Sequence, residues 1–223
     1  QRQSSATQAQ RAPAMVCDHV FPLIDRAFVL EASRLTRQHS APGVDKVTAQ
    51  HDAAHLDDTL RDVPERRRDN RYVAPPVERV WIEKEGGTQR PRGTPCYEDT
   101  IVPRAVGRIV EAIVEQDVQA CSHGFRKGHS PQQAWHAVRE PCRQCPRTWS
   151  VDADDRGCFD PIDHGPLRAC LQQRVNAGGL LRLIGTWRKA GVREAGTLTS
   201  PAKGTPQGGV ASPIVANVLL HHL

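Results

Sequence analysis

The sequence predicts an α/β fold of the α+β type, in which helices pack against an antiparallel sheet. Residues 77–94 place strand-forming segments on both sides of Gly86-Gly87, which is typical of a β-hairpin. Residues 99–119 carry apolar side chains at helical spacing, which indicates a helix with one buried face. Around Asp154 we expect the order strand, helix, helix, strand. No internal repeat or linker separates these elements.

Composition limits the class of protein. The 223 residues suit one large or two small domains, and 30 Lys and Arg against 25 Asp and Glu give a net charge of +5. This mild excess of cations allows nucleic-acid binding but does not establish it. No apolar run approaches ~18 residues, so we expect neither a membrane span nor a signal peptide. Seven cysteines without a secretory leader favour reduced thiols and a cytoplasmic protein.

Two helices are expected before the hairpin, after a polar segment, residues 1–14, that we predict to be disordered. The first spans about residues 21–37, and Pro22 is tolerated in its first turn. The second begins near Thr48 and ends at Pro64. The apolar residues of the first recur at helical spacing, which predicts that they face the core: Leu23, Ile24, Ala27, Phe28, Ala32 and Leu35.

The middle of the chain combines a cationic hairpin with further helices. The hairpin carries Lys84 on one arm and Arg90 on the other. Ser130 followed by Pro131 is typical of a helix start, and residues 193–200 form either a strand pair or a loop. Two helices should bury the following residues: Val102, Ala105, Ile109, Ile113 and Val114 in the first, and Leu180, Leu183, Ile184 and Trp187 in the second.

Residues 149–164 concentrate five carboxylates in a short run. Trp149 and Val151 alternate with Asp152 and Asp154, which predicts a strand with apolar residues on one face and carboxylates on the other. Asp160 has an ordinary explanation, because it precedes Pro161 at a predicted helix start. Asp154 has no such explanation, and a carboxylate at a strand end is well placed to meet a divalent cation.

Two long motifs carry a resemblance to a known family. Residues 154–164 read D-D-R-G-C-F-D-P-I-D-H and residues 204–217 read G-T-P-Q-G-G-V-A-S-P-I-V-A-N. They resemble the catalytic core of group II intron-type reverse transcriptases and maturases, where the patterns are D-I-K-G-C-F-D-x-I-D-H and G-T-P-Q-G-G-x-x-S-P-x-x-A-N. Weaker similarity extends upstream from Arg71 to Arg126, where His123 replaces the usual tyrosine of a Y-G-F-R element.

This resemblance implies a right-hand polymerase fold with fingers and a partial palm whose sheet is antiparallel. After the polar segment, residues 1–14, that composition predicts to be disordered, it divides the chain into N-terminal helices and fingers, residues 15–145, and a partial palm, residues 146–223. It also implies an RNA-directed DNA polymerase from a mobile element, a nucleotidyltransferase that uses two Mg²⁺ ions to extend a primer 3′ hydroxyl. The implied partners are a template or intron RNA, a DNA primer and a dNTP.

The same resemblance assigns roles to individual residues. Asp154 matches the first catalytic metal ligand, and the backbone carbonyl of Asp155 matches the usual contact to the second ion. Phe159 matches the residue under the sugar of the incoming nucleotide. The implied nucleotide-binding residues are Lys84, Arg90, Asp155, Phe159, Gln207 and Gly208, and the implied nucleic-acid-binding residues are Arg126 and Gly209.

Several departures leave alternatives open. The family's other catalytic aspartates lie in a Y-A-D-D box, and we expect this chain to be a fragment that ends before it and is inactive alone. Asp155 stands where an apolar residue is usual, so it either pairs with an arginine or reduces activity. The alternatives are an RNA-binding maturase fragment that assists intron folding without catalysis, and a degenerate relic.

Two residue-level alternatives are also open. Arg126 could be an arginine that only braces a helix entry, and Cys142 with Cys145 is a weak zinc hypothesis.

The last predicted helix begins at Ser212. It should present an apolar face that the family packs against palm strands beyond this chain. We therefore expect exposed apolar surface at Ile214, Val215, Val218 and Leu219.

Overall fold

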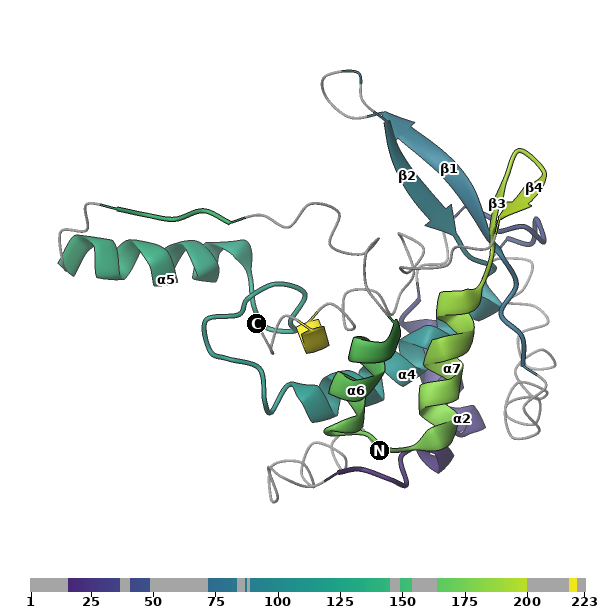
Figure 1. Cartoon of the computed structure of the whole chain (residues 1–223), viewed down its shortest axis with the longest axis horizontal. Coiled ribbons are helices and arrows are strands. Elements are labelled where there is room, and N and C mark those ends of the chain that lie inside the picture. The colour runs from purple at the N-terminus through teal and green to yellow at the C-terminus, as the bar shows by residue number, and fades with distance from the viewer. Residues whose placement is uncertain are drawn as a thin grey trace.

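The computed structural model describes residues 16–36, 41–48, 72–83, 87, 89–144, 149–153, 164–199 and 217–219. For Arg90, His164 and Arg188 it describes the backbone only. Helices form the body, and a four-stranded sheet lies at one end of it (Figure 1). The α/β class with packed helices is therefore confirmed.

The core is built around α4, Glu98–Val114. Its apolar residues recur every three or four positions, so one broad stripe is buried, and all five residues predicted to face inward are buried. Helix α2, Arg26–Arg34, packs against it. Arg108 of α4 fixes this contact, because its guanidinium lies 4.8 Å from the centre of the Phe28 ring and pairs with Glu31 at 2.6 Å.

The single helix predicted over residues 21–37 is wrong, because two elements occupy this stretch. A 3-10 turn, η1 (Phe21–Leu23), contains Pro22 and ends before α2 begins. The Asp25 side chain caps α2 by accepting a hydrogen bond from the Phe28 N–H at 2.7 Å, so α2 begins as a separate helix. Ala27 and Leu35 are consequently exposed rather than buried, whereas Phe28 and Ala32 are buried as predicted.

Helices α6 (His164–Gln172) and α7 (Gly178–Lys189) form a hairpin on the same core. Leu180, Leu183 and Ile184 are buried as predicted. The connection between the helices is held by a short bridge from Cys17 to Val175 and by an ion pair of 2.8 Å from Arg174 to Asp117. Segments that lie far apart in the sequence thereby share one core.

The sheet combines two hairpins in the order β2-β1-β3-β4. Strands β1 (Val77–Glu83) and β2 (Gln89–Thr94) are the predicted antiparallel hairpin. Strands β3 (Val192–Glu194) and β4 (Thr197–Thr199) settle the alternative left open for residues 193–200 in favour of a strand pair. The hairpins join through a parallel pairing of β1 with β3, which was not predicted. Glu194 stabilises the pairing of the two hairpins by accepting a hydrogen bond from the Trp81 indole N–H at 2.6 Å.

A buried polar chain ties α7 and α4 to the segment before β1. The Trp187 indole N–H donates to the Tyr72 hydroxyl at 3.0 Å, and that hydroxyl donates to Asp99 Oδ1. Tyr72 and Asp99 are both buried. Burial, and next the charge of Asp99, raise the pKa of the Tyr72 phenol, so the hydroxyl stays protonated and keeps its role as donor.

The turn predicted at residues 41–45 packs closely on the chain ahead of α4. A side-chain carbon added at Gly43 would lie 2.6 Å from the Cys96 backbone nitrogen, so only glycine fits there. Burial also raises the pKa of the Cys96 thiol to about 12, which leaves it protonated and unreactive near neutral pH.

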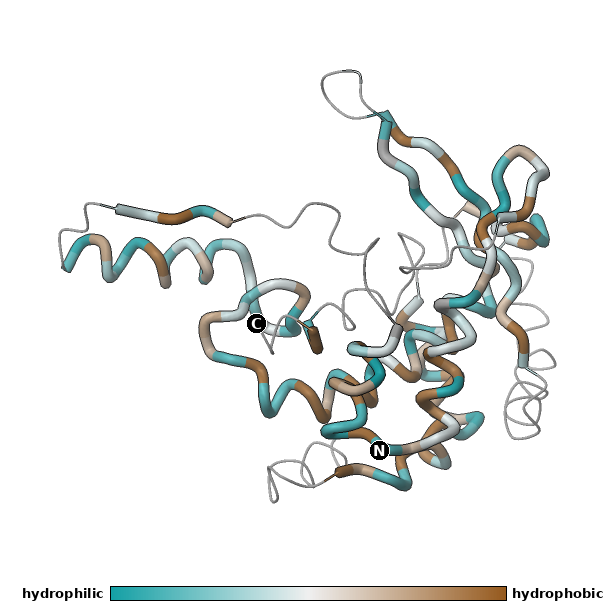
Figure 2. Tube along the Cα trace, viewed as in Figure 1, coloured by the Kyte–Doolittle hydropathy of each residue, from teal (hydrophilic) through white to brown (hydrophobic). Residues whose placement is uncertain are grey.

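Helix α5, Pro131–Gln144, extends away from the body (Figure 1). Figure 2 shows hydrophobic and hydrophilic residues alternating along it, as along α7, yet none of its described side chains is buried. Its predicted start is confirmed, because the Gln133 N–H donates to Ser130 Oγ at 3.3 Å and the Ser130 N–H donates to Gln133 Oε1 at 2.7 Å.

Two further predictions are corrected. Residues 149–153 form no strand, and Trp149 and Val151 are 89% and 94% exposed, because none of the described strands supplies a hydrogen-bonding partner. Val218 was expected to be exposed, but it is only 3% exposed and belongs to the main core. Residues 1–14, the helix near residues 48–64 and the Ser212 helix start lie outside the described residues. No helix in the described chain is long and apolar enough to cross a membrane.

Candidate functional site

Most of the predicted site residues lie outside the described chain. This holds for Lys84, Asp154, Asp155, Phe159, Gln207, Gly208 and Gly209. Arg90 lies in β2, where its backbone pairs with Ile82 of β1, so it occupies the hairpin arm predicted for it. Arg126 is the predicted residue whose side chain the structure describes, and it lies in the connection between α4 and α5.

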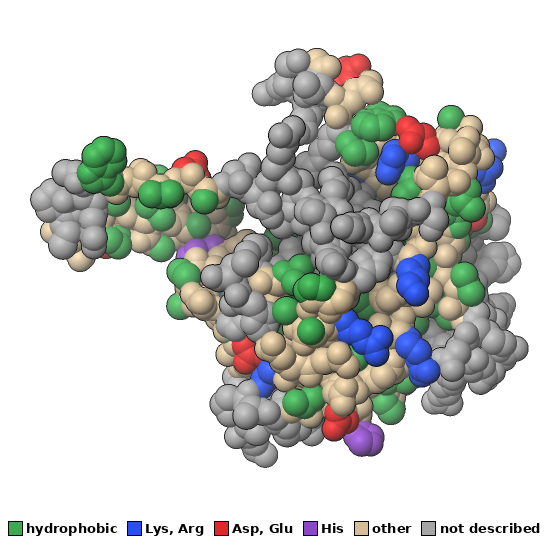
Figure 3. Space-filling model, in the orientation of Figure 1, with side chains coloured by type: hydrophobic (Ala, Val, Ile, Leu, Met, Phe, Trp, Pro, Cys, Tyr) green, Lys and Arg blue, Asp and Glu red, His purple; other side chains and the backbone are tan. Residues whose placement is uncertain are grey.

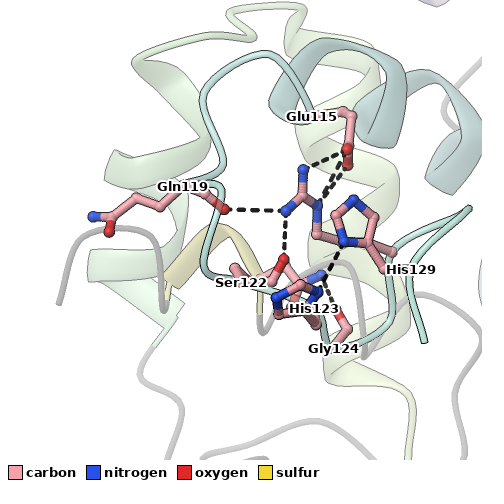
Figure 4. Close-up of polar contacts among 8 residues, drawn as sticks. Glu115, Gln119, Ser122, His123, Gly124 and His129 are labelled. Atoms are coloured by element: carbon pink, nitrogen blue, oxygen red, sulfur yellow. Dashed lines mark hydrogen bonds and ion pairs between the residues drawn. The ribbon is translucent and has the colours of Figure 1, made fainter. Parts of the chain in front are cut away.

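Arg126 braces this connection from inside, through contacts to Glu115, Gln119 and Ser122, which Figure 4 labels. Its Nε and Nη2 donate to the Glu115 carboxylate at 2.7–3.2 Å, and its Nη1 donates to the Gln119 carbonyl at 3.1 Å and to the Ser122 carbonyl. The side chain is 8% exposed. A guanidinium so enclosed fixes the loop, since it links the Glu115 carboxylate to two backbone carbonyls of the connection. Its nucleic-acid contact stays a prediction.

The loop that Arg126 fixes holds an exposed aromatic ring in a costly conformation. Phe125 has φ of +54° and is 70% exposed. A bulky residue in the left-handed region is uncommon and costs about 1–3 kcal/mol. Such strain is often found at functional sites, which makes Phe125 a candidate that sequence inspection missed. The signal was its place between Gly124 and Arg126 in the H-G-F-R element.

Two histidines close the other side of the loop. The Nδ1 atoms of His123 and His129 lie 3.2 Å apart, and the rings are tilted by 57° (Figure 4). One ring donates and the other accepts in this contact, and the tautomers decide which ring does which. His123, which stands where the family has tyrosine, therefore still has a polar partner within the loop.

The loop also meets the end of the second long motif. Asn217, the last residue of the G-T-P-Q-G-G motif, donates from its side-chain amide to the Gly124 carbonyl at 3.0 Å. The next residue, Val218, is buried in the core, and this burial fixes the end of the motif. Residues 93 positions apart in the chain thus share one site. The sequence shows the order of the two motifs but not their proximity, so this contact was not predicted.

The described residues offer no evident metal site. They contain no group of three or more His, Cys, Asp or Glu side chains that could hold an ion. The five described cysteines, Cys17, Cys96, Cys121, Cys142 and Cys170, are free thiols, and Cys145 of the zinc hypothesis lies outside the described chain. The described site can present a loop that Arg126 braces, with an exposed ring and the neighbouring exposed Lys127, to a ligand.

Comparison with known proteins gives the family. The family described as "Reverse transcriptase (RNA-dependent DNA polymerase)" matches residues 82–223. Protein YkfC of Escherichia coli (strain K12) is 31% identical over 97% of this chain and 58% of its own length. The group II intron-encoded protein LtrA of Lactococcus lactis subsp. cremoris is 34% identical over 75% of this chain. The match covers 29% of LtrA, so the chain corresponds to only part of these relatives.

A solved structure supports the fold. One chain of a structure titled "Partial Cas6-RT-Cas1--Cas2 complex" superposes with a TM-score of 0.54 at 22% identity. The superposition covers 89% of this chain and 33% of the other. At this identity the likeness concerns the fold alone.

Proposed function

Because the chain belongs to the reverse transcriptase (RNA-dependent DNA polymerase) family, we propose that it is part of a group II intron-type enzyme. In this proposal the enzyme copies an RNA template by adding dNTPs to a DNA primer. The observation that carries it is the family match over residues 82–223, which includes both long motifs. The match to LtrA over 179 residues favours the intron-encoded branch of the family.

Asp154 and the backbone carbonyl of Asp155 are the groups we propose to hold the metal. Carboxylate and carbonyl oxygens are the donors that Mg²⁺ prefers, so the donor set fits the ion. When bound, the ions lower the pKa of the primer hydroxyl and neutralise charge on the triphosphate. Asp154 would also position the hydroxyl by fixing the ions that face it.

The hairpin of β1 and β2 is proposed to supply the cations that face the triphosphate. Lys84 and Arg90 lie on opposite arms of it in the sequence, and the pairing of Arg90 with Ile82 supports this arrangement. Positioned cations stabilise the charge that develops on the leaving pyrophosphate. Phe159 would exclude a 2′ hydroxyl by its bulk, and Gln207 with Gly208 would hydrogen-bond the nucleotide or template.

Arg126 and Gly209 are proposed to serve nucleic-acid binding. With its guanidinium turned inward, Arg126 would act by holding the loop that presents Phe125 and Lys127. This role is indirect, and it is supported by the low exposure of the side chain. The link from Asn217 to Gly124 would keep this loop in register with the motif that contains Gly209.

The 223 residues alone are proposed to bind RNA without making DNA. The chain has two tyrosines, Tyr72 and Tyr97, and neither begins a Y-A-D-D sequence. One aspartate cannot hold two ions, so synthesis would need carboxylates from additional polypeptide. A maturase role, in which RNA is bound and folded, is the alternative that this observation favours.

Primer extension tests the proposal. An extended version of the chain that also carries a Y-A-D-D box should copy an RNA template with dNTPs and Mg²⁺. Asp154→Ala should abolish synthesis, whereas Asp152→Ala, which removes an exposed carboxylate two residues away, should retain it. Activity that survives Asp154→Ala would reject the assigned role, and binding without synthesis in the extended protein would favour the maturase function.

A further inference from the structure

Residues 164–193 concentrate the positive charge of the chain. They contain six Lys or Arg residues and no Asp or Glu, so their formal charge of +6 exceeds the +5 of the whole protein. The segment covers α6, α7 and the start of β3. None of the residues assigned above to the polymerase reaction lies in it. The charge of this segment therefore needs a separate explanation.

The helices direct several of these cations outward. Helix α7 buries Leu180, Leu183 and Ile184, so its opposite face carries Arg182 and Lys189. These two are seven residues apart, which places them on the same side of a helix, and both are exposed. Arg168 of α6 is exposed as well. Figure 3 shows Lys and Arg side chains gathered over α6 and α7.

These exposed cations differ from the structural arginines of the chain. Arg108, Arg126 and Arg174 each pair with a carboxylate and are largely enclosed. By contrast, no carboxylate of the described residues pairs with Arg168, Arg182 or Lys189. Surface cations are usually mixed with carboxylates, so a one-sign surface of this kind raises the local concentration of a polyanion.

A glycine lies between Arg182 and Lys189 on α7. Gly185 is on the same face, three residues after Arg182 and four before Lys189. A side-chain carbon added there would meet nothing within 4 Å, so packing does not require glycine. Glycine within a helix is unfavourable relative to alanine. Because glycine has no side chain, a ligand can approach the helix backbone closely at this position, which lies between two positive charges.

We propose that the face of α6 and α7 marked by Arg168, Arg182, Gly185 and Lys189 binds the phosphate backbone of a structured RNA. Arg and Lys are the usual partners of phosphate, and folded RNA is recognised largely through phosphates and 2′ hydroxyls. The choice of RNA rests on the proposed function. The contact itself needs neither metal nor nucleotide.

Salt-dependent binding tests the surface on the 223-residue chain. Each phosphate contact adds about 0.7–0.9 to the slope of log affinity against log salt concentration. For Arg182→Gln with Lys189→Gln we expect this slope to fall by about 1.5, and affinity at low salt to fall about tenfold or more. The probe is a folded RNA hairpin, with no Mg²⁺, primer or dNTP present. The matched control, Arg34→Gln with Arg143→Gln, removes two exposed cations from α2 and α5 and should leave the slope nearly unchanged.

A steric variant gives an independent test. Gly185→Gln adds bulk where the protein has open space and improves helix propensity, so folding should be preserved while RNA affinity falls several-fold. Gly185→Ala should have a smaller effect. Circular dichroism melting checks that the variants fold. A change in affinity that follows side-chain size would support close approach at this position.

Specific results would overturn the proposal. An unchanged slope for Arg182→Gln with Lys189→Gln, or an equal loss in the control, would exclude this surface as the RNA contact. Salt-dependent binding to phosphatidylserine vesicles that the same two substitutions remove, with RNA binding intact, would assign the surface to a membrane instead. The binding assay contains no Mg²⁺, primer or dNTP, whereas the polymerase proposal is tested by primer extension, so failure of the polymerase proposal and failure of this one give different results.

Discussion

Replacing Tyr72 with phenylalanine removes the centre of the buried polar chain between α7 and α4. The ring keeps its volume, so no cavity forms, and the loss is confined to the hydroxyl. That hydroxyl donates to the Asp99 carboxylate and accepts from the Trp187 indole at 3.0 Å. A hydrogen bond to a charged group contributes about 1.5–3 kcal/mol and one between neutral groups about 1 kcal/mol. We expect Tyr72→Phe to lower the free energy of unfolding by about 2–4 kcal/mol.

Urea denaturation followed by circular dichroism measures this loss. With a slope of about 2 kcal/mol per molar urea, the midpoint should fall by about 1–2 M. The pKa of Tyr72 is raised in the folded state, so the unfolded chain loses this proton first. Its contribution is complete below pH ~10 and is lost as pH rises further, by about 1.4 kcal/mol per pH unit. The phenylalanine variant should lack this part of the alkaline dependence.

Two results would refute the reasoning about Tyr72. A variant within about 0.5 kcal/mol of the parent would show that the hydroxyl contributes little beyond what water provides. An identical alkaline decline in parent and variant would show that Tyr72 does not carry the pH dependence. A double-mutant cycle with Trp187→Phe separates the second hydrogen bond from the first.

Three further predictions concern the loop and the motifs. Phe125→Gly should relieve the strain of the left-handed backbone and raise the free energy of unfolding by about 0.5–1 kcal/mol. The same change should weaken binding of single-stranded RNA, since base stacking on an exposed ring contributes about 1–3 kcal/mol. Unchanged binding would show that Phe125 is not part of the site. In an extended, active version, Phe159→Ala should raise incorporation of ribonucleotides relative to deoxynucleotides, and unchanged sugar selectivity would contradict its role. In the same version Gln207→Ala should slow incorporation with the melting temperature nearly intact, whereas a large loss of stability would show that Gln207 only braces its turn.

Local patterns predicted the local structure well. The helical spacing of apolar residues identified the buried stripe of α4, and the Gly86-Gly87 pair placed the hairpin of β1 and β2. Ser130 before Pro131 marked the start of α5. Each of these signals depends on residues within a few positions of one another, so each is visible in a linear sequence.

Contacts between distant segments were not predictable in the same way. The chain from Trp187 through Tyr72 to Asp99 and the parallel pairing of Val77 with Val192 join residues far apart in sequence. Period-two alternation at residues 149–153 predicted a strand, but a strand also needs a partner. The local pattern carries no information about whether such a partner strand exists.

The candidate site also has a part that was predictable from the sequence and a part that was not. Its motifs were visible in the sequence, and the family to which they point is confirmed. The inward direction of Arg126 was not visible, because Glu115 and the two carbonyls that hold it come from a turn with no sequence signature. The roles of Asp154 and the other motif residues are predictions that activity assays test.

Template-dependent DNA synthesis by the 223-residue chain is the most direct test of the claim that it contributes one part of a two-ion polymerase site. With Mg²⁺ or Mn²⁺, an RNA template, a DNA primer and dNTPs, the chain should bind RNA in a salt-dependent way and extend no primer. Joining a segment that carries the Y-A-D-D box should create synthesis that Asp154→Ala abolishes. Extension by the 223 residues alone, lost in Asp154→Ala, would contradict this account and mean that other carboxylates, most simply those of a partner chain, complete the site.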